Sequence, residues 1–170
     1  MNDTEKLSQT QRKWLLVLHL IFSGIMLAGA ITFLIFSITA AATHDEGVLK
    51  ACYIAMHVLA DSSIRASTIG AVVTGIALSV FTRWGLFRFY WIIVKEVLTL
   101  LAIAIGPFGM YFWSLKAMNL TSEEGLSALD NPEFIVNSGQ LWIGIVLQIL
   151  SLAAMFAISV FKPWGQRKQA

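Results

Sequence analysis

Four long apolar segments constrain this chain more than any other feature. They cover about residues 14–42, 48–81, 89–115 and 140–161, and crossing ~30 Å of hydrocarbon takes roughly 20 helical residues. Only 13% of the residues are charged, against about 25% in a typical soluble domain. The runs are continuously apolar, unlike the short alternating strands of a membrane barrel. The sequence therefore predicts an all-α integral membrane protein, in which residues 1–170 form one antiparallel bundle of four transmembrane helices.

The positive charges predict how this bundle is oriented. If both termini lie on the same side of the membrane, that side holds most of the lysines and arginines: Lys6, Arg12, Lys13, Arg83, Arg88, Lys162, Arg167 and Lys168. The other side is mainly acidic, in the turn after the first segment and in an expected outer loop over 117–139. The positive-inside rule places both termini in the cytoplasm, so we expect a multi-pass protein of the bacterial inner membrane. Within the outer loop, Thr121 and Glu124 have capping-box spacing, which predicts a short surface helix.

Small residues predict how the first two helices pack. They occupy every fourth position in two segments: Gly24, Ala28 and Thr32 in the first, and Ser67, Ala71, Gly75 and Ser79 in the second. Because helices in lipid associate through close packing, we expect these stripes to face each other. The alternative is that the second-segment stripe contacts another copy or a membrane protein partner. In the third segment Pro107 removes one backbone donor and predicts a kink, and in the fourth Gln148 and Ser151 are expected to face inward.

A polar stripe in the second segment is formed by His57, Asp61 and Arg65, which lie four positions apart. Counted from Arg83, these residues stand about 39, 33 and 27 Å along the helix, so we expect them at the outer face. In the structural interpretation, Asp61 pairs with Arg65 and caps the polar end of the bundle. In the functional interpretation, an outward-facing site for a soft metal such as copper is formed by Cys52, Met56, His57 and His44, because thiol, thioether and imidazole suit Cu(I).

A second candidate site lies in the expected inner leaflet and comprises His19, Lys95 and Glu96. Ionisable groups inside a membrane are functional-site hypotheses because burying their charge in lipid is expensive. The alternative is that Glu96 pairs with Lys95, Arg88 or His19 and only sets helix register. His19 and His57 are separated by ~30 Å along the bundle, so we expect no bis-histidine haem within one chain. A haem with His19 as its single ligand stays open.

The segments "KWLLVLHLIFSGIMLAGA" and "YWIIVKEVLTLLAIAIGPFG" resemble small four-helix bacterial membrane proteins related to copper-resistance protein D. A haem-pathway protoporphyrinogen oxidase is a more distant member of that group. The resemblance implies a four-helix membrane fold and draws attention to a first-helix histidine, a following glycine run and a third-helix lysine. These features correspond to His19, Gly24 with Gly29, and Lys95. The chain has "IMLAGA" where the group often carries Trp-Leu-Gly-Gly.

The remaining motifs narrow the classes of function. No hydrolase triad, phosphate loop, nucleotide fingerprint or zinc-ligand spacing is present in the sequence, so no enzyme class is predicted. The lysines and arginines cluster at helix ends, which does not indicate a nucleic-acid surface; the expected partner is the lipid bilayer. Three hypotheses follow: a protein that handles a metal ion or haem-type cofactor at His19, Lys95 and Glu96; an accessory or scaffold protein; and a proton-coupled small-solute transporter using Glu96.

Overall fold

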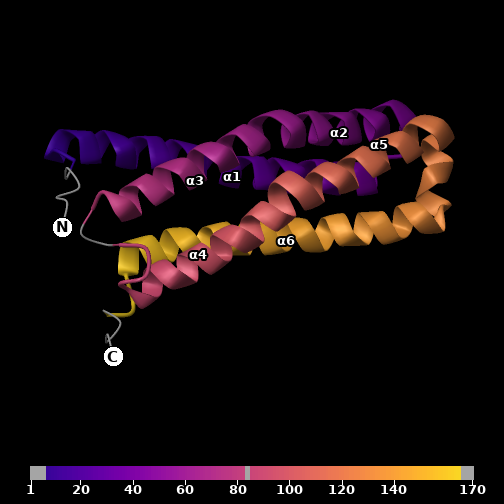
Figure 1. Ribbon diagram of the computed structural model, residues 1–170. Coiled ribbons are helices and arrows are strands. Elements are labelled where there is room, and N and C mark those ends of the chain that lie inside the picture. Colours follow the sequence, from indigo (N-terminus) through magenta and orange to yellow (C-terminus); the bar gives the residue numbers. More distant parts are fainter. Residues whose placement is uncertain (1–6, 83–84, 166–170) are drawn as a thin grey trace.

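The computed structural model describes residues 7–82 and 85–165. Four helices in this part of the chain are long and apolar enough to cross a membrane, as the sequence predicts (Figure 1). Two of them contain a π-helical segment. In chain order the elements are α1 (Gln9–Ala42); α2 (Glu46–Leu59), η1 (Ala60–Ile64) and α3 (Arg65–Val80); α4 (Tyr90–Ile103), η2 (Ala104–Met110) and α5 (Tyr111–Glu124); the 3-10 turn η3 (Gly125–Asp130); and α6 (Pro132–Phe161). Of the positive charges used to orient the bundle, Lys6, Arg83, Arg167 and Lys168 lie outside the described residues.

The helices extend further than the apolar segments. Helix α1 begins at Gln9 because Ser8 and Gln11 form a reciprocal capping box. The expected outer loop over 117–139 is wrong: α5 continues to Glu124, and α6 already begins at Pro132 after the cap Asn131. Hydropathy marks the stretch that suits lipid, whereas a helix continues as long as its backbone hydrogen bonds do.

The predicted capping box of Thr121 and Glu124 is also wrong, although the short surface helix expected in this stretch is present as the 3-10 helix η3. Thr121 is buried within α5, and its hydroxyl donates to the carbonyl of Ala117 at 2.8 Å. The chain turns at Gly125 instead, where φ is +62°. An added Cβ there would lie 2.7 Å from the Glu46 carboxyl group, so both the backbone angle and the close approach require glycine.

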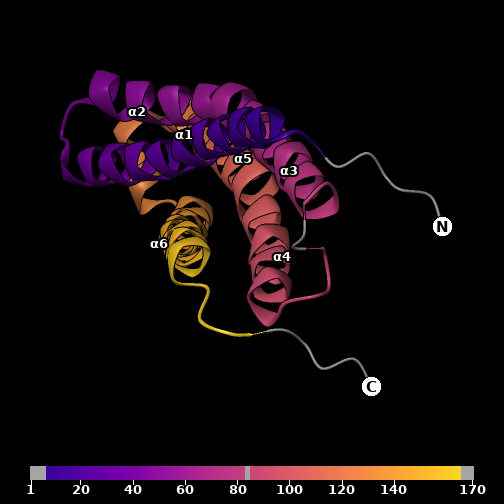
Figure 2. The ribbon, with the colours of Figure 1, turned by 90° about the vertical axis from the view of Figure 1, so that its left-hand side faces the viewer.

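The four long helices run antiparallel, and the start of α1 and the end of α6 lie at one end of the bundle (Figures 1 and 2). Helix α1 contacts α3, α2 and α6, and α5 contacts α2 and α6. We call residues 30–64 and 105–147 the distal half of the bundle, because they lie away from the termini. Residues 9–29, 65–80, 90–104 and 148–161 form the terminal half, in which the pair α1 and α3 diverges from the pair α4 and α6.

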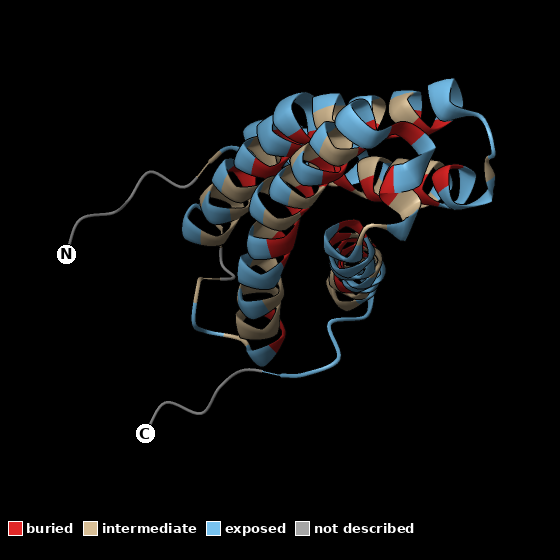
Figure 3. Cartoon of the chain, turned by 90° about the vertical axis from the view of Figure 1, so that its right-hand side faces the viewer, coloured by how far each residue is buried: buried red, intermediate tan, exposed pale blue. Residues whose placement is uncertain are grey.

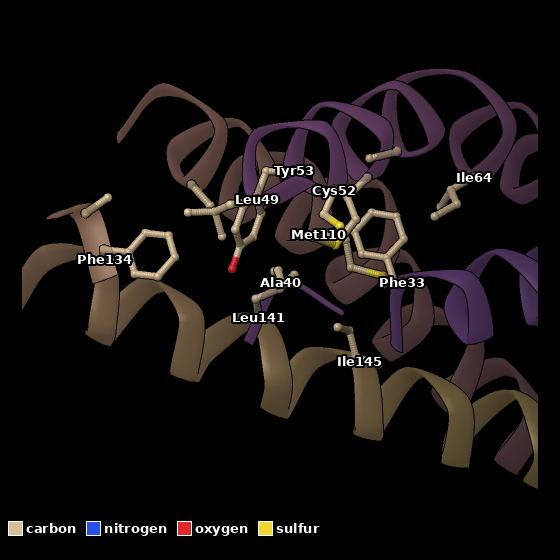
Figure 4. Close-up of a cluster of buried hydrophobic side chains, with 14 of the residues drawn as sticks. Phe33, Ala40, Leu49, Cys52, Tyr53, Ile64, Met110, Phe134, Leu141 and Ile145 are labelled. Atoms are coloured by element: carbon tan, nitrogen blue, oxygen red, sulfur yellow. The ribbon is translucent and has the colours of Figure 1, made fainter. Parts of the chain in front are cut away.

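The main core occupies the distal half (Figure 4). Its largest fully buried apolar side chains come from all four long helices: Phe33, Leu49, Met56, Met110, Leu141 and Ile145. Buried residues lie on the sides of the helices that face one another (Figure 3). Within the described residues, no residue of α1 before Met26 and none of α6 after Leu152 is buried. Burial in α1 and α6 therefore decreases toward the termini, whereas Trp91 and Ile92 at the start of α4 are buried.

The two π-helical segments contact each other between the halves. Ile64 of η1 packs against two glycines: a Cβ added at Gly29 would lie 3.1 Å from the Ile64 side chain, and one at Gly106 would lie 3.6 Å from it. Pro107 lies within η2 and has no backbone N–H to donate. The local disruption predicted at Pro107 thus takes the form of a π-helical segment inside a continuous helix.

Helices α1 and α3 pack against each other, but not through two facing stripes of small residues as predicted. On α3 the stripe does face α1: Gly75 approaches the His19 ring, and neighbouring Gly70 approaches the Phe22 ring. On α1, however, Gly24 and Ala28 are exposed, and an added Cβ at Gly24 would meet nothing within 4 Å. That part of the prediction is wrong because large side chains of α1 fill the space that the α3 glycines leave open.

Candidate functional site

A polar cluster in the terminal half draws one side chain from each of four helices. It consists of two hydrogen-bonded pairs, His19 on α1 with Thr74 on α3 and Lys95 on α4 with Ser159 on α6, and we call the two pairs together the His19–Lys95 cluster. Within the described residues no hydrogen bond or ion pair links the two pairs, so two of the three residues predicted for an inner-leaflet site share a region of the bundle and interact through charge alone. Thr74 and Ser159 were not predicted, because a single hydroxyl in an apolar helix is a weak signal without its neighbours.

His19 is held by its Nδ1 atom. This nitrogen lies 3.1 Å from the Ala71 carbonyl oxygen and 3.0 Å from Thr74 Oγ1. A carbonyl oxygen can only accept, so Nδ1 carries the hydrogen in this arrangement and Nε2 keeps its lone pair when the ring is neutral. The Thr74 hydroxyl in turn donates to the Gly70 carbonyl at 2.6 Å. Metal-bound histidines are usually oriented in this way, by a backbone carbonyl on the nitrogen that does not bind.

Gly75 sets the position of the His19 ring. A Cβ added to this glycine would lie 3.2 Å from Cε1 and 3.6 Å from Nδ1 of the imidazole. Any side chain at this position would therefore push the ring away from Ala71 and Thr74. The second-segment stripe of small residues contributes to the site by making room for an imidazole.

Lys95 is anchored by a hydroxyl and by no acidic residue. Its ammonium donates to Ser159 Oγ at 2.7 Å, and that hydroxyl donates to the Met155 carbonyl at 2.7 Å. In the described part of the chain no carboxylate lies within ion-pair distance of Lys95. The ammonium is near enough to His19 for its charge to act on the imidazole. The cluster thus offers a cation and an imidazole lone pair, which together suit an anionic ligand that contains a metal.

Glu96 lies beside Lys95 in the sequence but takes no part in the cluster. Its Oε1 atom is buried and has no hydrogen-bond partner in the structure. Glu96 forms no ion pair with either Lys95 or His19 within the described residues, so these two predicted pairings are wrong, and the pairing with Arg88 stays a prediction. Adjacent helical positions point about 100° apart, which separates the two side chains on α4.

His57, Asp61 and Arg65 form a second polar cluster together with Tyr111 and Ser114 of α5. Arg65 Nη1 pairs with Asp61 Oδ1 at 2.6 Å, which confirms the predicted ion pair. The Arg65 guanidinium lies 4.6 Å from the centre of the Tyr111 ring, which is itself 4.9 Å from the His57 ring. Ser114 Oγ lies 3.5 Å from His57 Nδ1.

This second cluster lies about midway along the bundle, whereas we expected it at the outer end. Asp61 and Arg65 flank Ile64, whose neighbours Gly29 and Gly106 belong to the middle of their own helices. The count from one helix end was sound. However, α1, α5 and α6 extend beyond the pair as far as α2 does, so the pair does not cap the bundle.

The four residues predicted to hold copper lie in different surroundings. Cys52 and Met56 are buried in the apolar core, where Ser37 donates to the Met56 sulfur at 3.7 Å. His57 faces α5, and His44 is exposed in the turn before α2. Nowhere in the described residues do three or more His, Cys, Asp or Glu side chains gather to hold a metal ion. Cys52 and Met56 share the core-facing side of α2, whereas His57 faces α5 and His44 precedes the helix.

Gln148 is buried, as predicted, and so is Ser151. The Gln148 side chain is 2% exposed, yet its Oε1 atom has no hydrogen-bond partner. Its Nε2 atom would lie 3.1 Å from a Cβ added at Gly106. Gln148 therefore contacts η2 with an unsatisfied polar group at the boundary between the two halves.

Similarity to known proteins adds nothing to this geometry. Comparison with protein-family profiles, with curated proteins and with solved structures gives no match for the chain. The chemistry of the two polar clusters therefore has to carry the functional argument.

Proposed function

We propose that this chain is a multi-pass protein of the bacterial inner membrane with both termini in the cytoplasm. The four apolar helices support membrane insertion. The charges support the orientation: Arg12, Lys13, Arg88 and Lys162 lie at the end that carries the termini, whereas Asp45, Glu46, Glu124, Asp130 and Glu133 lie at the other end. In this orientation the His19–Lys95 cluster belongs to the inner leaflet.

We further propose that the His19–Lys95 cluster binds a haem-type cofactor, with His19 as the single protein ligand to the iron. The observation that carries this proposal is the hydrogen bond from His19 Nδ1 to the Ala71 carbonyl, which leaves Nε2 as the ligating atom. A metal ion held by protein side chains alone needs several ligands, and the described residues gather no such set. A haem needs fewer, because the porphyrin supplies the other nitrogens.

Lys95 fits the same cofactor. Haem carries propionate groups, and the Lys95 ammonium has a hydroxyl partner but no carboxylate partner within the described residues. A cation in a membrane interior is usually compensated by an anion or faces water. The resemblance to proteins related to copper-resistance protein D, in which a first-helix histidine and a third-helix lysine recur, is consistent with this pairing. The bound haem would supply one-electron chemistry, and the chain would orient the imidazole and neutralise the propionate.

An absorption spectrum of the protein purified in mild detergent, first oxidised and then reduced, tests the cofactor. We expect a Soret band that is lost in His19→Ala and retained in His57→Ala, which removes the other imidazole of the membrane helices. Lys95→Met should reduce the haem content without abolishing the band, because it removes the propionate partner and keeps the iron ligand. A spectrum without a Soret band in protein from haem-supplemented cells would refute the proposal, as would a band unaffected by His19→Ala.

Glu96 supports a second candidate function, proton-coupled transport of a small solute. Its buried, unpaired Oε1 is a suitable group for binding and releasing a proton. Proteoliposomes that contain a pH-sensitive dye would measure proton flux. We expect Glu96→Gln to abolish the flux and Glu123→Gln, at the exposed distal end, to leave it intact. Equal flux in the two variants would exclude this function. Failure of both proposals would leave the accessory or scaffold role.

A further inference from the structure

The π-helical segment η2 joins α4, which carries Lys95, to the buried helix α5, and it contains Pro107. In a π-helix each N–H bonds the carbonyl five residues back, so a turn holds one residue more than a turn of α-helix. Proline has no N–H to donate, and in an α-helix its ring clashes with the carbonyl four residues back. That carbonyl belongs to Ile103. An unbroken α-helix would impose this clash at Pro107, and the chain forms a π-helical turn instead.

The extra residue in η2 sets the rotation of α4. Successive residues of an α-helix turn by about 100° and rise by ~1.5 Å. One additional residue per turn therefore rotates α4 by about 100° against α5, and each residue of α4 stands where the next one would stand in an unbroken α-helix. In the structure Lys95 occupies the position that faces Ser159. Without the extra residue, Glu96 would occupy it.

The surroundings of the two helices indicate which of them would turn. Helix α5 is held in the core, where Met110 beside it and Ala117 within it are both fully buried. Helix α4 packs mainly against α6 and continues into η2. A change in the number of residues per turn within η2 would therefore rotate α4 and leave α5 in place.

Such a rotation would matter most at the two charged residues. The Lys95 ammonium donates to Ser159, whereas Glu96 Oε1 is buried and has no hydrogen-bond partner within the described residues. At the buried start of α4 the exchange is apolar for apolar, because Ile92 would take the place of Trp91. The main result would be a carboxyl group in place of an ammonium in the His19–Lys95 cluster.

We propose that Pro107 is a positioning residue for the His19–Lys95 cluster: by keeping η2 π-helical, it directs Lys95 rather than Glu96 toward Ser159. The consequence for binding rests on the proposed cofactor, since a carboxylate at this position would repel a propionate that the ammonium attracts. The rotation of α4 itself does not depend on any ligand.

Cross-linking of paired cysteines measures the rotation of α4 against α6. In a Cys52→Ala chain, which lacks the only native cysteine, Ser159→Cys is combined with either Lys95→Cys or Glu96→Cys. The reagent is a membrane-permeant bifunctional thiol cross-linker about as long as a lysine side chain, and mass spectrometry of the digested protein detects the link. With Pro107 present, we expect a link from Lys95→Cys and little or none from Glu96→Cys.

Pro107→Ala removes the clash and supplies the missing N–H, so it should reverse this preference. The link from Lys95→Cys should be lost and the link from Glu96→Cys gained. Pro132→Ala is the matched control, because Pro132 lies in the first turn of α6, where proline disrupts no hydrogen bond; it should leave the preference as it is. An unchanged preference in Pro107→Ala, or a link at neither position, would overturn the proposal.

A deletion distinguishes the rotation of α4 from any other effect of losing the proline. Phe108 is 58% exposed, so deleting it removes no core side chain. In Pro107→Ala without Phe108, an α-helix through the shortened segment returns α4 to its native rotation, and the link from Lys95→Cys should reappear. A link that stays at Glu96→Cys would contradict the proposal. The cross-links form without haem, so a missing Soret band would refute the cofactor and leave this test valid.

Discussion

The distal and terminal halves of this bundle are built from the same four helices, yet they bury their side chains to different extents. In the distal half, Phe33, Met56 and Leu141 are closed off from the surroundings, and buried Asn137 donates to the Trp113 carbonyl at 2.9 Å. In the terminal half the inward-facing His19 and Lys95 are only partly buried. The difference indicates that one half holds the fold together while the other leaves polar groups accessible for binding.

Glycine positions show how this difference arises. In the distal half Gly144 faces the Trp113 ring, so the absence of a side chain allows a large aromatic group to pack between α5 and α6. In the terminal half Gly75 makes the same kind of space for His19, whereas Gly24 faces outward and makes space for nothing. Where a glycine faces therefore decides whether it serves the core, the site or neither.

The largest difference in stability between the two halves is expected when one phenylalanine in each half is truncated to alanine. Phe33→Ala should lower the free energy of unfolding by about 3–5 kcal/mol, because it leaves a cavity in a closed core. Phe22→Ala, in the terminal half, should cost less than half as much, because Phe22 is only partly buried. Denaturation of the purified protein in mixed detergent micelles would measure both values. Equal losses would mean that the terminal half is packed as tightly as the distal half.

Two glycine substitutions are expected to change the stability by smaller amounts, and differently in the two halves. Gly144→Ala forces a Cβ against the Trp113 ring, and such overpacking typically costs about 1–3 kcal/mol. Gly24→Ala meets nothing within 4 Å, and alanine is favoured over glycine inside a helix by about 0.5–1 kcal/mol. Thermal unfolding should therefore shift down for the first variant and up, or not at all, for the second. Destabilisation by Gly24→Ala would instead support the predicted contact between the two stripes of small residues.

The smallest effect is expected at the boundary between the halves. Gln148→Met removes a buried oxygen that has no hydrogen-bond partner and replaces the side chain by one of similar length. The unfolding free energy should stay unchanged or rise by up to about 1 kcal/mol, because no hydrogen bond of that oxygen is lost. The same denaturation assay measures it. A loss above about 2 kcal/mol would show that the Gln148 amide makes a stabilising contact, which would extend the tightly paired region into the terminal half.

Much of the candidate site could be predicted from residue type and position. His19 and Lys95 stand out because an ionisable residue in an apolar helix is rare, and their similar depth suggested that they could meet. Glu96 was predicted by the same argument and does not join them, because adjacent residues on α4 point to different sides. Thr74 and Ser159 could not be predicted, because a hydroxyl acquires its role only from the partner that the packing brings to it.

The limits of prediction differ between the helices and their ends. Apolar length identified four helices long and apolar enough to span a membrane, but it missed the start of α6 at Pro132 and the continuation of α5 to Glu124. Helices beyond the lipid-compatible stretch are held by caps such as Asn131 and by contacts with their neighbours, which hydropathy does not measure. The π-helical segment around Pro107 follows from the missing N–H, but its contact with η1 does not.

Hydropathy, charge distribution and the spacing of polar residues were sufficient to establish the helical class, the number of long helices and the Asp61–Arg65 pair. Each of these depends on one helix at a time, and the regular rise and rotation of a helix can be counted along the chain. The rotation of each helix against its neighbours was settled by packing in three dimensions. That rotation turned Gly24 outward, brought His19 against Ala71, and left the Asp61–Arg65 pair on an exposed face midway along the bundle. It depends on how side chains of several helices fit together at once, and no single segment contains that information.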